Sequence, residues 1–192
     1  MFQKVKRFLA RVLPVPARMF HRSVQEQNRD VKKIKTQLND FEIKFLRIQK
    51  QPRLSFFVLN ILDHCNLKCK GCDHFSSIAE ERFVPAQTIM RDLARMSKLT
   101  EGAVTRIGVM GGEPLLHPEL PEILQAARGS FPETLIQLFS NGLLLLQQGE
   151  DFWSSCRENN IHIVVTKYPI SINFERVEET AKDKKVAFSY FG

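Results

Sequence analysis

The sequence has no run of eighteen apolar residues, which is about the length that a membrane-spanning helix needs. No apolar segment follows the basic residues near the N-terminus, so we expect no cleaved signal peptide. Gly/Ser-rich and low-complexity tracts are also lacking. A chain of 192 residues with 43% hydrophobic content can bury a real core, so we predict one domain with an appendage. We expect it in the cytoplasm, where thiols stay reduced.

Cysteine is scarce, with four residues in the chain, and its distribution is uneven. Three of the four fall within the stretch LDHCNLKCKGCDHF at C-x3-C-x2-C spacing, as Cys65, Cys69 and Cys72. The fourth, Cys156, stands far away near Phe152 and Trp153, and we predict that it is a buried core thiol. Clustered thiols in a reducing compartment bind metal more often than they form disulfides.

Acidic residues are few in the first part of the chain, which makes the net charge of +7 misleading. Residues 1–53 contain 14 Lys/Arg and 4 Asp/Glu, or +10, whereas the remaining 139 residues contain 14 and 17, or −3. The basic character therefore belongs to an appendage. A slightly acidic domain is not, on charge alone, a nucleic-acid binder, so we expect no nucleic acid as partner.

The first thirteen residues have the pattern of a basic amphipathic helix. Their apolar residues fall on one helical face and their basic residues away from it, until Pro14 and Pro16 interrupt the pattern. Such a helix can lie on an anionic membrane surface or in the groove of a partner. Docking on the chain's own domain is the alternative. A peripheral contact with the inner face of the membrane would suit work on cell-surface glycans or lipid-linked molecules.

Residues 20–50 carry an apolar seam spaced by three and four residues, which is the a/d pattern of a coiled coil. Its members are Val24, Gln27, Val31, Ile34, Leu38, Phe41, Phe45 and Ile48. We predict that this segment forms a homo-oligomer, with a single helix packed on the domain as the alternative. The break at Gln51-Pro52 ends it, so we expect an extension over 1–53 and a core domain over 54–192.

From Leu54 onward, strand patterns alternate with helical ones. The predicted strands are SFFVLNIL, AVTRIGVM, LIQLF, IHIVVT and KVAFSYF, with a helix between each pair. This alternation predicts βαβ units and a parallel sheet, because parallel neighbours need a crossover. Periodicity alone leaves two folds open, a doubly wound sheet and a partial barrel. In both of them ligands gather at the C-terminal ends of the strands.

Polar and glycine-rich stretches follow each of the first four predicted strands. The cysteine cluster follows the first strand, and MGGEPLLHPEL follows the second. FSNG follows the third and TKYP, with Thr166 and Lys167, follows the fourth. Since parallel strands end at a common edge, the four stretches are predicted to form one site.

Three thiols admit two kinds of metal site. A structural zinc ion needs a fourth ligand, which could be His64, His74 or Cys156. Three ligands on a [4Fe–4S] cluster instead leave one iron open for a small molecule. The cysteines alone do not separate these possibilities.

The combination of motifs resembles the radical S-adenosylmethionine (radical SAM) enzymes over about residues 54–192. That family has a C-x3-C-x2-C loop after the first strand of a partial (β/α)6 barrel. GGEP after the second strand matches the family element that contacts the methionine amino group of S-adenosylmethionine (SAM), and SNG resembles the family's turn beside this cofactor. The resemblance implies an α/β fold, a partial barrel of the radical SAM type.

The resemblance also implies the site and its chemistry. A [4Fe–4S] cluster would be held by Cys65, Cys69 and Cys72, and SAM would be bound by Gly111, Gly112, Glu113, Pro114, Ser140, Asn141 and Thr166. One electron, from a donor such as flavodoxin or ferredoxin, would cleave SAM to a 5′-deoxyadenosyl radical. That radical would abstract hydrogen from an unidentified substrate. The alternatives are a zinc-stapled, non-catalytic interaction module and a truncated relative without turnover.

The sequence departs from the family pattern in two places. Gly71 stands where many members carry an aromatic residue against adenine, and Phe75 is a candidate substitute, although a packing role is the simpler expectation for it. The chain also ends after its fifth predicted strand, before the sixth strand of the family. We therefore expect either a fragment of a longer chain or a barrel that a partner completes.

Overall fold

The computed structural model describes residues 26, 28–42 and 54–191. The chain divides into two units, Met1–Gln51 and Pro52–Gly192, and each is described by itself. Within the described residues no helix is long and apolar enough to cross a membrane. The amphipathic segment predicted over residues 1–13 lies outside the described residues.

The second unit is built on a five-stranded, wholly parallel sheet. Its strands lie in chain order, β1-β2-β3-β4-β5. Their bounds are β1 (Phe57–Asn60), β2 (Arg106–Met110), β3 (Leu135–Ser140), β4 (Ile161–Thr166) and β5 (Ala187–Phe191). All five were predicted from the sequence, and β4 has the predicted bounds.

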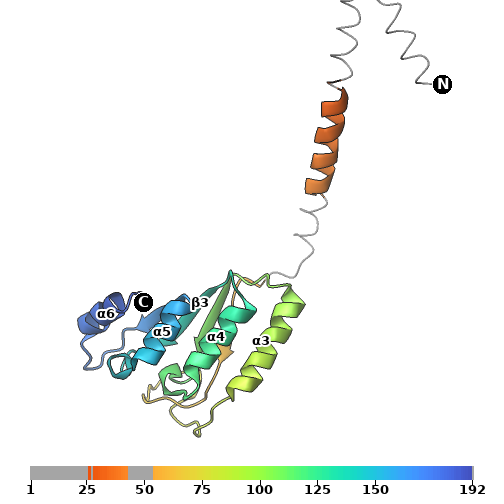
Figure 1. The fold of residues 1–192 in the computed structure, drawn as a ribbon. Helices are drawn as coiled ribbons and strands as arrows, with labels where there is room; N and C mark the ends of the chain where they lie inside the picture. The colour runs from red at the N-terminus through yellow and green to blue at the C-terminus, as the bar shows by residue number, and fades with distance from the viewer. Residues whose placement is uncertain (1–25, 27, 43–53, 192) are drawn as a thin grey trace, which may run out of the picture. The chain divides into compact units, whose positions relative to one another are not determined.

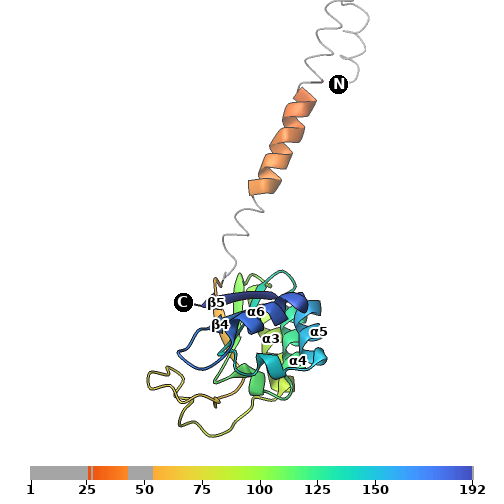
Figure 2. The ribbon, with the colours of Figure 1, turned by 90° about the vertical axis from the view of Figure 1, so that its left-hand side faces the viewer.

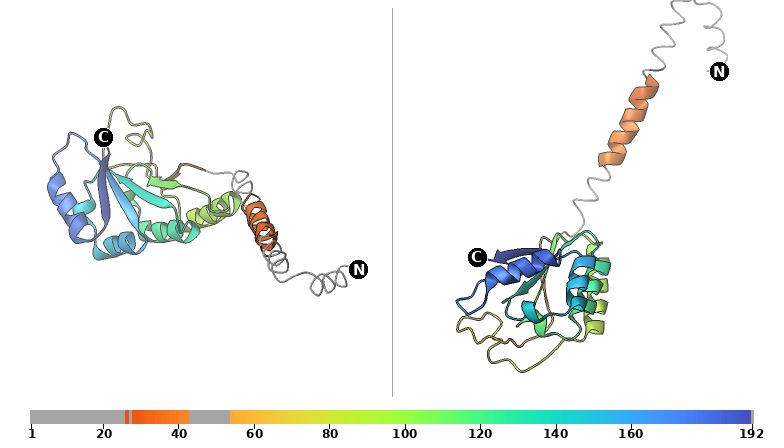
Figure 3. Two further views of the ribbon diagram at one scale, coloured as in Figure 1. Left: turned by 90° about the horizontal axis from the view of Figure 1, so that it is seen from above. Right: turned by 60° about the vertical axis from the view of Figure 1, so that its left-hand side comes forward.

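A helix crosses from each strand to the next. The crossover helices are α3 (Ala86–Thr100), α4 (Leu120–Ser130), α5 (Glu150–Glu158) and α6 (Phe174–Asp183). Two short 3-10 helices, η1 (Pro114–Leu116) and η2 (Leu145–Gln147), follow β2 and β3. Because crossovers are right-handed and the strands advance in one direction, every helix falls on the same face. Figures 2 and 3 show this one-sided layer, which is a partial barrel rather than a doubly wound sheet.

Alternate strand residues point toward the helices and form the core. In register across the sheet lie the rows Ile107–Ile136–Ile161 and Val109–Leu138–Ile163, all at most 1% exposed. They pack with buried helix residues such as Ile123 and Trp153. Among the described residues no helix covers the opposite face of the sheet, and there Val58 is 39% exposed. Within this part of the chain, that face is therefore open to a ligand.

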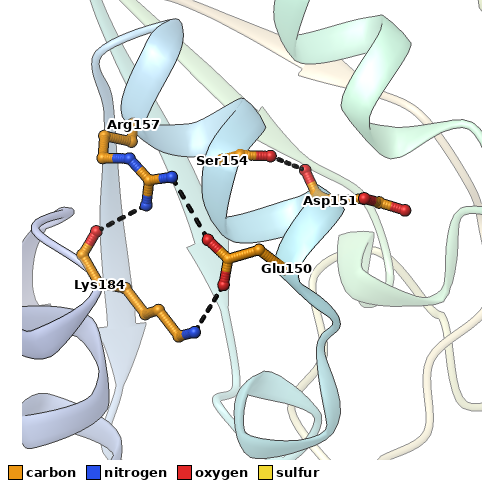
Figure 4. Close-up of polar contacts among 5 residues, drawn as sticks. All are labelled: Glu150, Asp151, Ser154, Arg157 and Lys184. Atoms are coloured by element: carbon orange, nitrogen blue, oxygen red, sulfur yellow. Dashed lines mark hydrogen bonds and ion pairs between the residues drawn. The ribbon is translucent and has the colours of Figure 1, made fainter.

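Ion pairs connect α5 to the end of α6 at the surface (Figure 4). Glu150 accepts hydrogen bonds from Lys184 at 2.6 Å and from Arg157 at 3.3 Å, and Arg157 also donates to the Lys184 carbonyl at 3.0 Å. Hydrogen bonds from these two cations lower the pKa of Glu150. The Ser154 hydroxyl donates to the backbone carbonyl of Asp151 at 3.1 Å. Such exposed pairs contribute little stability.

In the first unit, residues 28–42 form a helix. Four apolar side chains spaced three, four and three residues apart are exposed by half or more, namely Val31, Ile34, Leu38 and Phe41. The helix expected from the seam is therefore present over these residues, whereas its pairing stays a prediction.

We expect the intact chain to self-associate through this seam, because an isolated helix of this length is marginal in water unless its apolar face is buried. Replacing Ile34 and Leu38 together with Asp should convert the oligomer into a monomer in light scattering. The matched control replaces Thr36 and Asn39, on the opposite side of the helix, with Asp and should keep the oligomer. A monomeric wild-type chain at micromolar concentration would contradict pairing.

Candidate functional site

The three clustered cysteines lie on the long loop between β1 and α3, which extends past the ends of the strands (Figure 2, yellow). The two ends of the loop pair with each other. The Val84 N–H donates to the Ile61 carbonyl at 2.9 Å, and the Asp63 N–H donates to the Arg82 carbonyl at 3.2 Å. The thiols are all partly buried and free of disulfide bonds. The hydrogen bonds therefore hold the first and last residues of the loop together, and the three cysteines lie on the segment between them.

Two glycines after β2 seat the start of this loop. The Gly112 N–H donates to the Leu62 carbonyl and the Glu113 N–H to the His64 carbonyl, each at 3.1 Å. A Cβ at Gly112 would lie 1.8 Å from the His64 carbonyl oxygen, and one at Gly111 would lie 2.4 Å from that of Leu62. The resemblance implied that Gly111 and Gly112 bind SAM. The close approach in the structure is that of the cysteine loop's own backbone.

The Glu113 carboxylate joins the segments that follow β2 and β3. It accepts hydrogen bonds from the Ser140 hydroxyl at 2.8 Å, the Asn141 N–H at 2.9 Å and the Leu115 N–H at 3.2 Å. The Ser140 hydroxyl oxygen in turn accepts from the Gly142 N–H at 3.0 Å. Glu113 is 1% exposed. Its carboxylate is thus a buried connector that positions the Ser140–Asn141 turn.

Burial raises the pKa of Glu113 to about 7, although the three hydrogen bonds, led by that from the Asn141 N–H, favour the ionised form. The folded state then binds a proton that the unfolded state has already lost between about pH 4.5 and 7. The contribution of this group to stability is full below pH 4.5 and is lost as the pH rises to about 7.

We therefore predict that the free energy of unfolding falls by roughly 3 kcal/mol over this range because of Glu113. Denaturant unfolding of the wild type and of Glu113→Gln at several pH values isolates the effect, since Gln does not titrate. The difference in the free energy of unfolding between the two proteins should change by roughly 3 kcal/mol across this pH range. A difference independent of pH would contradict the raised pKa.

Asn141 connects the turn after β3 to the cysteine loop. Its amide nitrogen donates to the Asn66 side-chain oxygen at 2.7 Å and lies 3.7 Å from the Cys65 sulfur. Its side-chain oxygen accepts from the Leu143 N–H at 3.0 Å. The following Gly142 has a positive φ of 83°, which explains why Asn-Gly occurs here. Asn141 therefore fixes the position of the first cysteine.

The four thiols have different environments. Burial raises the pKa of Cys65. Backbone N–H groups, first that of Ser76 and then those of His74 and Phe75, lower the pKa of Cys72. Cys156 is fully buried in α5, and burial raises its pKa to about 12, which confirms it as a core thiol. Because Cys156 lies in the core, it is not a candidate fourth metal ligand.

A cavity of about 1030 Å³ lies between the cysteine loop and the free face of the sheet. Its wall includes Cys65, Cys69 and Cys72 together with Gly111, Gly112, Glu113, Ser140, Asn141 and Thr166. Side chains from the strands, such as Val58, Phe139 and Val164, also line it. Ligand sites usually measure about 300–1,000 Å³. The cavity is therefore large enough for a cofactor and a substrate together.

Other residues that the sequence singled out have different places. Pro114 lies outside the cavity wall and begins η1. The Lys167 ammonium lies 3.7 Å from the centre of the Tyr190 ring. His64 packs edge-on against Phe83, with its Nδ1 enclosed and without a partner among the described residues.

Tyr168 is an aromatic residue of the cavity wall that the sequence analysis did not single out. Phe75, which the sequence suggested as a cover for adenine or, more simply, as a packing residue, is 69% exposed and lies outside the cavity wall, so the expectation that it packs was wrong. Tyr168 lines the cavity. Burial and then the negative charges of Cys69, Cys65 and Cys72 raise the pKa of Tyr168. Its place in TKYP, directly after the predicted strand, was the available signal.

The residues present fit a [4Fe–4S] cluster. Three thiols of one loop face one cavity, and N–H groups near the Cys72 sulfur are the donors that stabilise a thiolate. A cubane takes its three sulfur ligands at separate corners. Among the described residues no three His, Cys, Asp or Glu side chains converge as a single metal ion requires.

Comparison with protein families shows to which family this chain belongs. The model of the radical SAM superfamily matches residues 59–183, more than half of the chain. The chain belongs to the radical SAM superfamily. This confirms the family expected from the motifs. Members of the family are enzymes that use a [4Fe–4S] cluster and SAM.

Curated relatives match over part of the chain. A GTP 3′,8-cyclase of Trichodesmium erythraeum is 30% identical over 107 residues, covering 53% of this chain and 32% of the cyclase. A GTP 3′,8-cyclase of Chlorobaculum tepidum is 35% identical over 88 residues, covering 44% and 24%. The matched part thus spans about a third or less of these relatives' length.

Solved structures confirm the fold. BtrN in complex with AdoMet (SAM) and 2-DOIA superposes with a TM-score of 0.55 at 20% identity, covering 73% of this chain and 57% of BtrN. The structure of anSMEcpe with bound AdoMet gives a TM-score of 0.56 at 22% identity, covering 72% of this chain and 43% of anSMEcpe. Streptococcus suis SuiB bound to S-adenosylmethionine gives 0.54 at 17%, covering 80% and 36%. The partial barrel is therefore the fold of this family.

Proposed function

We propose that this chain is the cofactor-binding core of a radical SAM enzyme. A [4Fe–4S] cluster would be held by Cys65, Cys69 and Cys72, with SAM beside it at the strand ends. When bound, this pair supplies one-electron cleavage of SAM to a 5′-deoxyadenosyl radical, which abstracts hydrogen from a substrate. The observation that carries the proposal is the common cavity, because the three thiols and the turns after β2, β3 and β4 all line it.

The chain's own residues hold and shield the cofactors. Gly112 and Glu113 bind the backbone of the cysteine loop, and Asn141 fixes that loop to the turn after β3. Tyr168 lies just after β4 and lines the same cavity as the thiols. Gly111, Asn141 and Thr166 line the part of the cavity wall at the strand ends, where SAM would lie. Pro114 would act by shaping the turn, since it lies outside that wall.

The proposed partners follow from the chemistry. Cleavage requires an electron donor such as flavodoxin or ferredoxin. The match covers 32% and 24% of the two cyclases' length, so the similarity supports the family's cofactors more than the cyclases' substrate.

The proposal is tested by anaerobic reconstitution with iron and sulfide, followed by reduction with dithionite in the presence of SAM. We expect about four iron atoms for each chain, the visible absorption of an iron–sulfur cluster and formation of 5′-deoxyadenosine. Stoichiometric zinc without cluster absorption would favour the structural zinc module. Cluster and SAM binding without 5′-deoxyadenosine would favour the relative that lacks turnover.

A further inference from the structure

One charged side chain stands out on the otherwise uncharged sheet. Among the residues of the five strands β1–β5, Arg106 is the one charged residue, counting Arg, Lys, Asp and Glu. Arg106 lies at the start of β2 and lines the same cavity as the thiols. Among the described residues Arg106 has no hydrogen-bond or ion-pair partner, and its guanidinium lies 4.4 Å from the centre of the Phe56 ring. Stacking of this kind orients a guanidinium while leaving its N–H donors free.

Phe56 and Phe139, near Arg106, form an apolar surface on the cavity wall, which we call the floor. Gly108 lies two positions along β2 on the same face, and a Cβ there would come within 3.0 Å of Phe56 and 3.1 Å of Phe139. The two rings therefore close over a strand position where no side chain projects. Phe139 packs edge-on against Phe191 of β5. This part of the cavity thus offers apolar, flat surface beside one positive charge.

A polar group without a partner lies next to this floor. Gln137 of β3 pairs in register with Gly108, and both residues point to the free face of the sheet. Its side-chain oxygen is enclosed but has no hydrogen-bond partner among the described residues, and Gln137 lines the cavity. A buried acceptor without a partner costs stability, so a ligand that supplies a donor would remove that cost.

The position of Arg106 within the barrel indicates which molecule would bind there. Arg106 begins β2 and the glycines that seat the cysteine loop follow its end, so the two sites lie roughly 13 Å apart along the strand. SAM beside the thiols would therefore leave the Arg106 end of the cavity for another molecule. A molecule held at Arg106 would extend toward the cofactors across the floor of Phe56 and Phe139.

We propose that Arg106 is the substrate-recognition residue of this cavity and that the substrate carries an anionic oxyacid group, a carboxylate or a phosphate. The Arg106 guanidinium donates to two oxygens of this group, as its forked geometry favours. The body of the substrate lies on Phe56 and Phe139, and the Gln137 oxygen accepts a hydrogen bond from it. This inference rests on the proposed function, because it takes the radical SAM cavity to be the substrate site.

The test uses three aromatic probes of similar size, phenyl phosphate, phenylacetate and benzyl alcohol. Each is titrated by calorimetry into the intact, reconstituted chain in the presence of SAM. We expect binding of at least one anion and weaker binding of the uncharged alcohol. Arg106→Gln should weaken the anion about tenfold or more, and Arg106→Lys should restore part of the affinity. Preference for phenyl phosphate or phenylacetate tells which oxyacid the site takes.

The matched control is Arg91→Gln, since Arg91 is an exposed arginine of α3 that pairs with Asp92. It should leave the binding of both anions unchanged. Equal weakening by Arg91→Gln and Arg106→Gln, or absence of anion binding by the wild type, would overturn the proposal. Iron content and SAM affinity should be unchanged in Arg106→Gln, and their loss would assign Arg106 to folding or to the cofactors instead. A chain that binds anions through Arg106 but takes up no cluster would contradict the proposed function and not the anion site.

Discussion

Replacing Cys69 with Ala should reduce the iron content of the reconstituted protein from about four atoms for each chain to nearly none. The three cysteines share one loop and one cavity, and the Cys156 sulfur is confined to the core. No other thiol can therefore replace a lost ligand at the cavity wall. Iron analysis and the visible absorption spectrum after anaerobic reconstitution measure the effect.

The control for this experiment is Cys156→Ala, which removes a thiol without touching the cavity. It should retain the full iron content, although the variant loses some core packing. If Cys69→Ala kept its iron, or if Cys156→Ala lost as much as Cys69→Ala, the assignment of the three ligands would be wrong.

Replacing Gly112 with Ala should destabilise the domain by more than about 3 kcal/mol and prevent cluster assembly. The new Cβ would lie 1.8 Å from the His64 carbonyl oxygen and 2.9 Å from the Cys65 nitrogen, so the base of the cysteine loop must move. This backbone cannot give way like the end of a flexible side chain, because hydrogen bonds from Gly112 and Glu113 hold it in place. Denaturant unfolding measures the loss of stability.

Gly129→Ala is the matched control. Gly129 lies in α4, and a Cβ there would meet nothing within 4 Å. Alanine should therefore stabilise the helix by about 0.5–1 kcal/mol. Equal effects of the two substitutions would mean that the close approach at Gly112 does not determine the structure of the loop.

The elements of the domain were predictable because their patterns are local. IHIVVT is bounded by polar residues on both sides, five of its six residues are β-branched, and it forms β4 with the predicted bounds. Local sequence patterns could not decide between an open sheet and a partial barrel. It depends on the order of the strands, and a helix of given amphipathicity packs equally well on either face of a sheet.

The cysteines and the glycine turns could be assigned from spacing, whereas the contacts between them could not. No pattern in the sequence tells that the Glu113 side chain turns inward to Ser140 and Asn141 instead of facing a ligand. Phe75 was considered because it is close to the cysteines in sequence. Tyr168 instead reaches the cavity from a strand about a hundred residues further on, and this closeness is a product of the fold.

In the proposed site three thiols hold a cluster whose remaining iron binds SAM. This is tested by calorimetric titration of SAM into the reconstituted chain and into the same chain without its cluster. We predict one SAM for each reconstituted chain and an affinity at least about tenfold lower, or about 1.4 kcal/mol in binding free energy, without the cluster. Equal affinity with and without the cluster would contradict it, because SAM would then be bound by the protein alone.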